Sequence, residues 1–429
     1  MCYNINDDGK SVTMTYERLI MFAHDAPAPT FKGYIGHVGI PEKVEHEGKS
    51  YKVTAIDDNA FSCNTELQMV VIPSTVKNIG REAFAYCSRL EKVMLPPNLT
   101  AISENMFAES AVREVIIPAK VKSIGKGAFN NCYLKSIDIP GSVKTIGEGA
   151  FSACRWMETV TLGKGVETIG DGAFSICTSL KTISLPASLR TIGDRAFYEC
   201  GSMEQLSIPA SVTSIGDGAF SNCKKLANVN VEPGNKKYDS RQGCNAIIET
   251  ATNTLVAGFE TSVIPQSVTG IGAQAFAGCR NMEQVTIPTS VTSIGGQAFF
   301  YCTSIRHLVI PNSVTTINER AFCGCDSLLT VEIGNSVTRI GYGAFLHDDH
   351  IKAVTIGSAV KAIDAWAFKG LDDVTSITSL IQDVSGVAMG KDVFDEIDKK
   401  ACTLYVPAGT AQHYKAAPQW KEFVNIVEQ

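Results

Sequence analysis

Phenylalanine and isoleucine recur along most of this chain at a fixed interval. Successive phenylalanines lie 22 or 23 positions apart, with one gap of 56, and an isoleucine precedes each of them by five positions. The repeated unit reads AFxxCxxLxxVxIPxSVxxIGxx. A period of this length is typical of repeat architectures, so the 429 residues are expected to form one continuous solenoid instead of two or three globular domains. The recurring phenylalanines are Phe61, Phe84, Phe107, Phe129, Phe151, Phe174, Phe197 and Phe220, then Phe276, Phe299, Phe322, Phe345 and Phe368.

Each repeat contains one segment with strand periodicity and one that returns the chain. The V-x-I triplet alternates on a period of two, as a β-strand does, and the proline after it ends the strand because it has no N–H to donate. Glycine in I-G-x-x-A-F permits a tight corner, and A-F-x-x-C-x-x-L is interpreted as one helical or 3-10 turn. The predicted fold is an α/β-type leucine-rich repeat solenoid of about 23 residues per repeat. We expect a curved right-handed coil, with a parallel β-sheet on its concave face and short helical or 3-10 turns on its convex face. The 22-residue repeats around Phe107 to Phe151 should lose a residue in a loop and keep the strands in register.

Stacked repeats place equivalent side chains about 4.8 Å apart, so the phenylalanines should form a continuous spine. Cysteine follows phenylalanine by three positions in nine repeats. This row could be a chain of disulfides or metal ligands, or a row of buried small hydrophobic residues. We favour reduced, buried thiols, because free cysteine is among the most buried residue types and because Ser110, Asp348 and Leu371 occupy the same slot. A mostly serine ladder after the proline should satisfy backbone groups at the turn.

Composition narrows the classes of function. Hydrophobic residues make up 45% of the chain, which is enough to bury a large core. A net charge of −6 gives no support for nucleic acid or an anionic membrane as the main partner. No run of 18 apolar residues occurs, and neither a phosphate-binding loop nor a G-x-S-x-G elbow is found. We therefore expect no transmembrane segment, no nucleic-acid partner and no cofactor.

Two short motifs could suggest a metal site. Cys323 and Cys325 form C-x-C, and His347 and His350 form H-x-x-H in the repeat that carries Asp348 in place of cysteine. Cys325 belongs to the cysteine ladder, and the histidines fit an exposed polar turn. We expect no bound metal at either motif.

These repeats resemble the BspA-like leucine-rich repeat family, also known from treponemal surface repeats, over roughly residues 38–429. The tail CTLYVPAGTAQHYKAAPQWKEFVNIVE is similar to the C-terminal cap of gut Bacteroides surface proteins, and the opening YNINDDGKSVTMTYE is similar to their N-terminal strands. The resemblance implies a role in adhesion or host interaction without naming a ligand. Such relatives usually carry an export signal upstream, which this sequence lacks. We expect an extracellular, cell-surface or periplasmic location.

The organisation expected along the chain has five parts. Two β-prone runs at 246–249 and 254–257 flank a polar turn, which predicts a hairpin in the gap of the repeat. The parts are an N-terminal β cap at 1–37, leucine-rich repeats at 38–231, a β-hairpin insertion at 232–262, repeats continuing the same solenoid at 263–400 and a C-terminal cap at 401–429.

The concave face is the usual binding surface of curved solenoids. Its outward strand positions are small and neutral in the middle, apolar toward the N-terminus, and interrupted by a histidine and a carboxylate later on. Aromatic residues are missing from these strand positions, which weakens a lectin interpretation. The candidate surface residues are Met69, Val71, Lys92, Met94, Glu114 and Ile116, together with His307, Val309 and Glu332.

The sequence favours a non-catalytic cell-surface binding or adhesion scaffold that recognises a host or bacterial macromolecule, either an extracellular protein or a polysaccharide. A glycan-binding module of a carbohydrate-capture system is the alternative, because Ser, Thr, Asn and Gln line the strands. A hydrolase or lyase is disfavoured, because no cluster of titratable groups was found that interrupts the repeat. We expect no enzyme activity.

Overall fold

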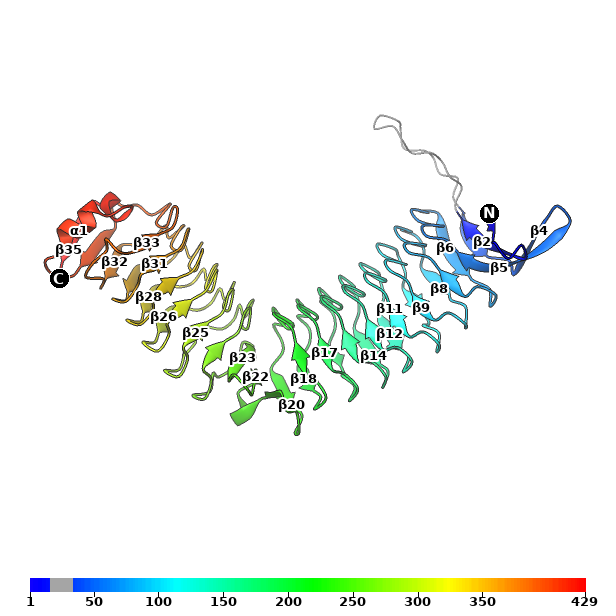
Figure 1. Cartoon of the computed structure of the whole chain (residues 1–429), viewed down its shortest axis with the longest axis horizontal. Coiled ribbons are helices and arrows are strands. Elements are labelled where there is room, and N and C mark those ends of the chain that lie inside the picture. The colour runs from blue at the N-terminus through cyan, green and yellow to red at the C-terminus, as the bar shows by residue number, and fades with distance from the viewer. Residues whose placement is uncertain (16–33) are drawn as a thin grey trace, which may run out of the picture. The chain divides into compact units, whose positions relative to one another are not determined.

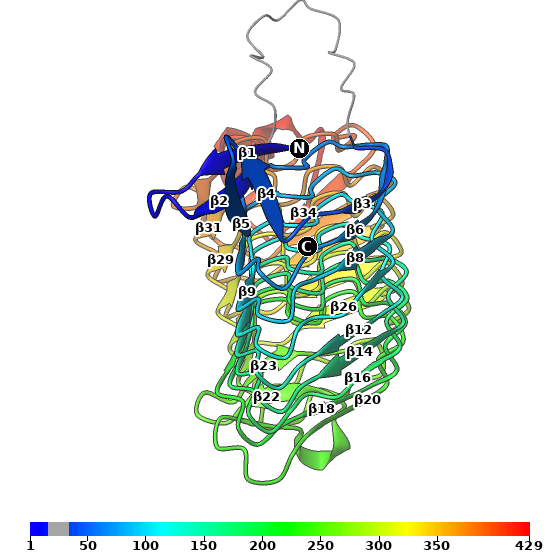
Figure 2. The ribbon, with the colours of Figure 1, turned by 90° about the vertical axis from the view of Figure 1, so that its right-hand side faces the viewer.

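Within each of two units, successive turns of the chain stack on one another, and most turns contribute a strand to parallel pairing on two sides of the stack (Figure 1). The computed structural model describes residues 1–15 and 34–429, which divide into unit 1, Met1–Ala219, and unit 2, Phe220–Gln429. We call the strands of the V-x-I-P segments the long strands. The short strands are those that end at the isoleucine of I-G. In unit 1, Figure 2 shows the long strands β6, β8, β12, β14 and β16 on one side of the turns and the short strand β9 on the other.

From β6 to β19, strand partners in unit 1 lie 22 or 23 positions apart, as the repeat predicts: Ser136 pairs with Thr159, and Thr145 with Thr168. Strand β3 pairs with β6 at a longer interval, with His37 beside Met69. The long strands of unit 1 are β3 (Gly36–Gly39), β6 (Leu67–Val71), β8 (Lys92–Met94), β10 (Glu114–Val115), β12 (Ser136–Ile139), β14 (Thr159–Leu162), β16 (Thr182–Ile183) and β18 (Gln205–Ile208). Its short strands are β7 (Asn78–Ile79), β9 (Ala101–Ile102), β11 (Ser123–Ile124), β13 (Thr145–Ile146), β15 (Thr168–Ile169), β17 (Thr191–Ile192) and β19 (Ser214–Ile215).

Unit 2 repeats the same arrangement, with Thr316 paired to Arg339 and Val331 to Val354. Its long strands are β20 (Asn228–Val231), β26 (His307–Ile310), β28 (Thr330–Ile333), β30 (Ala353–Ile356), β32 (Ser376–Ser379), β34 (Thr403–Val406) and β35 (Asn425–Glu428). Its short strands are β24 (Gly270–Ile271), β25 (Ser293–Ile294), β27 (Thr316–Ile317), β29 (Arg339–Ile340), β31 (Ala362–Ile363) and β33 (Ala388–Met389).

Strands at the N-terminal end of unit 1 do not follow the repeat. In unit 1, β1 (Cys2–Ile5), β2 (Ser11–Thr15), β4 (Lys43–His46) and β5 (Lys49–Ile56) form a mixed sheet whose strand β5 also pairs with β7. The hairpin of β4 and β5 therefore lies inside the segment predicted as repeats. Part of the predicted N-terminal cap, residues 16–33, lies outside the described residues.

The gap in the repeat contains antiparallel pairing. Strand β21 (Tyr238–Asp239), the 3-10 turn η1 (Arg241–Gly243), β22 (Ile247–Glu249) and β23 (Thr254–Ala257) follow one another in unit 2. β22 and β23 are an antiparallel hairpin, and β23 also pairs in parallel with the short strand β24. Strand β23 of the hairpin thus occupies the place of a short strand.

The division of the chain into caps, repeats and insertion stays a prediction.

Phenylalanine rings stack along the inside of each unit. Ring centroids of successive residues from Phe61 to Phe197 lie 4.8–5.6 Å apart. In unit 2 the spacing from Phe276 onward is 5.0–5.9 Å. The unit 2 stack includes Phe394, which the sequence pattern missed because it follows Phe368 by 26 positions and is preceded by valine. Trp420 is the first residue of the 3-10 turn η2 (Trp420–Glu422) and is fully buried. It packs against Phe394 at the end of the row of rings.

The predicted helical or 3-10 turns of the A-F segments are wrong. Among the described residues, the one α-helix is α1 (Ala411–Ala416), and neither 3-10 turn lies on an A-F segment. Gly149 and Ala153 flank the segment around Phe151 with positive φ angles of 57° and 59°, which an α-helix does not accommodate. The N–H groups of Gly149, Phe151 and Ala153 donate to carbonyl groups of the next repeat, at 2.7–2.8 Å. The segment is therefore a chain of tight turns bonded to its neighbour.

The repeated glycine after isoleucine has a different role from the one predicted. A Cβ on Gly147 would lie 2.8 Å from the carbonyl carbon of Gly125 in the preceding repeat, and one on Gly170 would lie 2.8 Å from the nitrogen of Glu148. Close approach of successive turns therefore selects glycine here.

The 22-residue repeats keep register among the short strands, where β9, β11 and β13 pair in sequence, as expected. They also keep register between the long strands β8 and β10, where Lys92 pairs with Glu114. Pairing of the long strands stops between β10 and β12, and it stops again between β16 and β18, where the repeat has 23 residues. A shortened repeat therefore does not by itself interrupt the long-strand sheet.

Side-chain hydrogen bonds explain two of the ladders. The thiols of Cys87, Cys132 and Cys154 each donate to the carbonyl of the phenylalanine in the preceding repeat, at 3.1 Å. Similarly, Ser142 and Ser188 donate to backbone carbonyls of the preceding repeat, at 2.6 Å. The serine ladder therefore satisfies backbone groups as predicted, while the cysteine ladder combines an apolar surface with a weak donor.

Removing one stacked ring should destabilise unit 2 strongly. Phe322 is 1% exposed and lies between Phe299 and Phe345, so Phe322→Ala should cost about 3–5 kcal/mol in the free energy of unfolding. Phe300→Ala is the matched control, because Phe300 is only partly buried and packs edge-on against Tyr301. Urea unfolding followed by circular dichroism measures both. Equal decreases in the free energy of unfolding for the two variants would show that a stacked ring contributes no more to stability than a partly buried phenylalanine does.

The ladder thiols should stay reduced and unreactive while the chain is folded. Burial raises the pKa of Cys87, Cys132 and Cys177 to about 12, and the thiolate is the form that reacts. A thiol reagent applied to folded protein without reductant should modify Cys63, which is exposed, and Cys2, which is partly exposed. In denaturant it should recover most of the fourteen. Recovery of only a few would show that disulfides link the repeats.

Candidate functional site

Six predicted surface residues come together on the long-strand face of unit 1. The register places Met69 beside Lys92 and Val71 beside Met94, and it places Lys92 beside Glu114. Val71, Met94 and Ile116 occupy the same outward slot of three adjacent repeats and are 39%, 49% and 79% exposed. We call Met69, Val71, Met94 and Ile116 the apolar patch.

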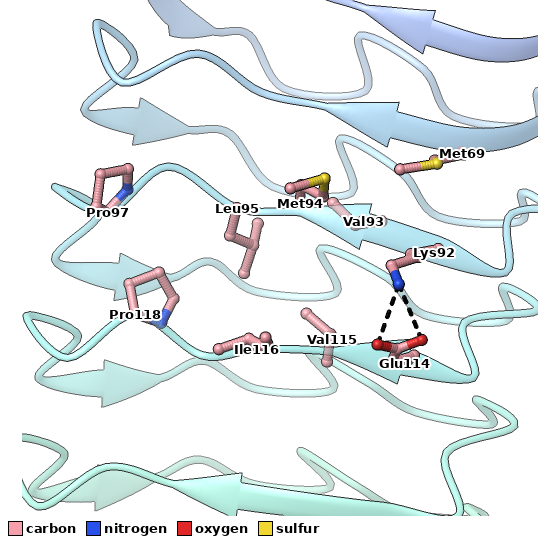
Figure 3. A pocket seen from close by; sticks show the side chains of 10 residues that line it. All are labelled: Met69, Lys92, Val93, Met94, Leu95, Pro97, Glu114, Val115, Ile116 and Pro118. Atoms are coloured by element: carbon pink, nitrogen blue, oxygen red, sulfur yellow. Dashed lines mark hydrogen bonds and ion pairs between the residues drawn. The ribbon is translucent and has the colours of Figure 1, made fainter.

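A cavity of about 470 Å³ lies at this patch (Figure 3). Met69, Met94 and Ile116 line it, together with five residues that the sequence analysis did not select: Val93, Leu95, Pro97, Val115 and Pro118. The cavity lies where the long-strand sheet stops at β10. The apolar outward residues Met94 and Ile116 in adjacent repeats were the signal in the sequence that pointed to it.

An ion pair forms the polar part of this cavity. The Lys92 ammonium lies 3.1 Å from both carboxylate oxygens of Glu114 (Figure 3). Both side chains are about half exposed, so the pair contributes at most about 1 kcal/mol to stability. Its main consequence is that opposite charges cancel next to the apolar patch.

A second cavity of about 570 Å³ shares Met69 and Lys92 with the first. Arg89, Arg113 and Tyr133 line it, and the Arg113 guanidinium lies over the Tyr133 ring, 5.5 Å from its centroid. Sequence reasoning missed Tyr133 because it lies in a turn ahead of β12, outside the strand positions. Methionine, tyrosine and arginine are residue types enriched at protein–protein interfaces.

The other predicted residues lie in unit 2. Val309 of β26 is paired in register with Glu332 of β28, and Nδ1 of His307 lies 2.9 Å from the hydroxyl of Thr330. Val309 is 57% exposed. These side chains share one exposed strand face, and Val309 is a single apolar residue between polar neighbours.

The two motifs considered for metal have structural partners. The Cys325 thiol donates to the carbonyl of Phe299, and Nδ1 of His350 lies 3.1 Å from the carboxylate of Asp373. Across residues 1–15 and 34–429, no group of three or more His, Cys, Asp or Glu residues is arranged to hold a metal ion.

Asp348 is buried in the slot that cysteine occupies in most repeats. Its Oδ1 accepts the backbone N–H of Cys325 at 2.6 Å, while Oδ2 has no hydrogen-bond partner among the described residues. Burial raises the pKa of Asp348 well above its usual range, and the N–H of Cys325 only partly opposes this. Asp348 thus imposes a pH-dependent cost on the fold.

Two parallel strands per turn and an inward row of Phe, Cys, Leu and Ile define a leucine-rich repeat solenoid, a scaffold whose repeats present long surfaces. The chain belongs to the BspA-type leucine-rich repeat family. The family model described as "BspA type Leucine rich repeat region" matches in 6 copies, over residues 47–135, 153–254 and 253–375.

Solved structures of bacterial leucine-rich repeat proteins are similar to this chain. A leucine-rich cell surface protein of Faecalibacterium prausnitzii is 30% identical, with a TM-score of 0.66 over 88% of this chain and 92% of its own. A leucine-rich repeat protein of Bacteroides ovatus is 27% identical, with a TM-score of 0.64 over 100% of this chain and 98% of its own. The pneumococcal vaccine antigen PcpA shares the fold at 18% identity, with a TM-score of 0.53 over 90% of this chain and 92% of its own.

A search of curated proteins found no significant match. In the part of the chain that the structure describes, no helix has the length and apolar character needed to cross a membrane.

Replacing Asp348 should stabilise the protein in a pH-dependent way. Because the pKa of Asp348 is higher in the folded than in the unfolded chain, its protonated form is favoured by folding, and the cost in the wild type grows as the pH rises above about 3.9. Asp348→Asn should therefore unfold at a higher temperature than the wild type at pH 7, and the difference should shrink toward pH 4. The exposed Asp138, changed to asparagine, is the control. A difference that does not vary with pH would contradict this account.

Proposed function

We propose that this chain is a non-catalytic cell-surface binding scaffold that docks an extracellular protein of a host or another bacterium through the apolar patch of unit 1. The observation that carries the proposal is the run of Val71, Met94 and Ile116 in one outward slot of three adjacent repeats, beside a cavity of about 470 Å³. The name of the Faecalibacterium relative, a cell surface protein, supports an extracellular location.

The energetics of the patch favour a protein partner. Covering an aliphatic side chain such as Ile116, 79% exposed, contributes about 1.5–3 kcal/mol, whereas the rest of the long-strand face offers mainly small polar side chains. The cations near the patch each pair with a carboxylate of a neighbouring repeat: Arg89 with Glu66, Lys92 with Glu114 and Arg113 with Glu91. A neutral rim around an apolar centre is the arrangement of a protein-docking site.

The composition of this surface is also the argument for a binding role over catalysis. Apart from the Lys92–Glu114 pair, the first cavity is lined by apolar residues, which bury surface but transfer no protons. The Ser, Thr, Asn and Gln row keeps glycan capture as the alternative for the long-strand face.

Charge placed on the apolar patch should abolish binding. Met94→Asp together with Ile116→Asp puts two carboxylates at the centre of the docking surface, where their desolvation would oppose burial. Surface plasmon resonance against a panel of immobilised extracellular-matrix proteins (collagens, laminin and fibronectin) should show binding by the wild type, and at least a tenfold loss in the double variant. Its melting temperature should change little, because both side chains point outward.

The matched control is Thr161→Asp with Ser184→Asp, which adds the same charges in the same slot of two other adjacent repeats, at exposed positions. It should bind like the wild type. Binding retained by the Met94 and Ile116 variant would place the site elsewhere, and measurable turnover of any polysaccharide would contradict the absence of enzyme activity.

A further inference from the structure

Unit 2 contains a polar pocket at the ends of its short strands, on a different part of the repeat from the apolar patch. It has a volume of about 470 Å³ and is lined by side chains that follow, or belong to, strands β24, β25, β27, β29 and β31. We call Ala273, Gly296, Glu319, Arg339, Tyr342 and Asp364 the strand-end pocket.

The pocket exists because several repeats depart from the consensus at neighbouring positions. The slot two residues after the repeated isoleucine holds Glu148, Asp171 and Asp194 in unit 1, but Ala273 and Gly296 here. These two small residues leave space across adjacent repeats. The slot before it, normally glycine, holds Asn318 and Asp364, which add polar groups to the walls.

The walls are held in place by contacts among the lining residues and with residues behind them. The Arg339 guanidinium binds Oδ2 of Asp364 through Nε and Nη2, at 3.0 and 2.8 Å. The Tyr342 ring packs against Trp366, with centroids 5.3 Å apart, and the Arg320 guanidinium lies over it at 5.5 Å. An aromatic ring, a guanidinium and carboxylates are thus positioned before any ligand arrives, which lowers the cost of binding.

The groups present define the chemistry of the ligand. Glu319 and Asp364 accept hydrogen bonds, Arg339 donates them, and the phenolic hydroxyl of Tyr342 can do both. Such a mixture suits hydroxyl groups, which need a donor and an acceptor at each position. Apolar surface from Ala273, Ile317, the tyrosine ring and the aliphatic stems of the polar side chains makes up about half of the lining, so the pocket combines apolar contact with hydrogen-bonding groups.

The charge and the length of the pocket further restrict the class of ligand that it can bind. Asp364 neutralises Arg339, and Glu319 makes no ion pair among the described residues. The Arg320 guanidinium over the Tyr342 ring offsets the charge of Glu319, so the pocket is close to neutral and offers no net charge to attract an ion. The lining residues span five neighbouring strands, a length of about 19 Å at the usual strand spacing. We infer that the strand-end pocket is a binding site for a neutral, linear oligosaccharide, whether or not the apolar patch binds protein.

Filling the floor of the pocket tests this site. Gly296 has no left-handed φ, and a Cβ there would lie 3.3 Å from Cγ of Glu319, so Gly296→Glu places a third carboxylate inside the cavity and requires only a small shift of the Glu319 side chain. Glu104 and Glu148 occupy the same slot in other repeats, which indicates that the fold accepts this residue. Thr286→Glu is the matched control, because it adds the same charge to an exposed position elsewhere in the same repeat.

The experiment uses the full chain on an array of neutral fragments of β-glucan, xylan, mannan and galactan, with polygalacturonan, heparin and oligolysine as charged probes. The wild type should bind at least one neutral fragment, and Gly296→Glu should weaken that binding at least tenfold. Arg339→Gln, which removes a donor without filling the cavity, should also weaken it. Thr286→Glu and the Met94 and Ile116 double variant should bind the fragment as the wild type does, so this site and the proposed protein-docking surface can fail separately.

Several results would overturn the inference. One is the absence of binding to every neutral fragment, and another is neutral binding that survives both Gly296→Glu and Arg339→Gln. Binding of oligolysine that Gly296→Glu strengthens would make the pocket a cation site. Binding confined to polygalacturonan or heparin would show that the charge argument is wrong.

Discussion

Backbone hydrogen bonding between successive turns is the constraint on which the rest of this protein depends. Each turn donates N–H groups to the turn beside it in both sheets and again through the A-F segment, where Phe151 donates to Ala173 and Phe174 to Ala196. This bonding fixes the separation of the turns at the strand spacing. Everything that repeats in the sequence must then fit a neighbour at that distance, which accounts for stacked phenylalanine rings, for glycine where backbones nearly touch, and for thiols that reach the carbonyl of the previous phenylalanine.

The same constraint determines where surfaces for other molecules can arise. Interior side chains must stack on the equivalent side chains of neighbouring turns. Differences in residue type between repeats are therefore concentrated in the outward slots and at the strand ends. In unit 1 the outward slot holds Val71, Met94 and Ile116 in three adjacent repeats, next to the end of one long-strand sheet at β10. In unit 2 small residues at 273 and 296 open a pocket between larger side chains. Asp348 shows the cost of variation inside the stack, because a carboxyl group takes a slot suited to a thiol.

The two candidate surfaces differ in the chemistry that they offer. The apolar patch has exposed aliphatic and thioether groups with a charge-neutral rim, which is suited to burial by another protein. The strand-end pocket combines fixed donors and acceptors with apolar surface, which is suited to a ligand that carries hydroxyl groups. A repeat scaffold can carry both, because each repeat contacts only its neighbours and local departures leave distant turns unaffected.

The sequence by itself determined the period, the solenoid, the family, the buried phenylalanine row and the proline that follows most long strands, because these depend on residue types that recur at fixed spacing. It also selected the outward residues Met69 to Ile116, since alternation along a strand assigns faces directly. Tertiary structure alone decided the conformation of the A-F segments. Their spacing is compatible with a helical turn, but alternate N–H groups bond to the next repeat, and those between them close tight turns within the segment. Only the tertiary structure showed that Phe394 belongs to the row of stacked rings and where both cavities lie. These features depend on which residues of successive turns become neighbours and on the space left between them.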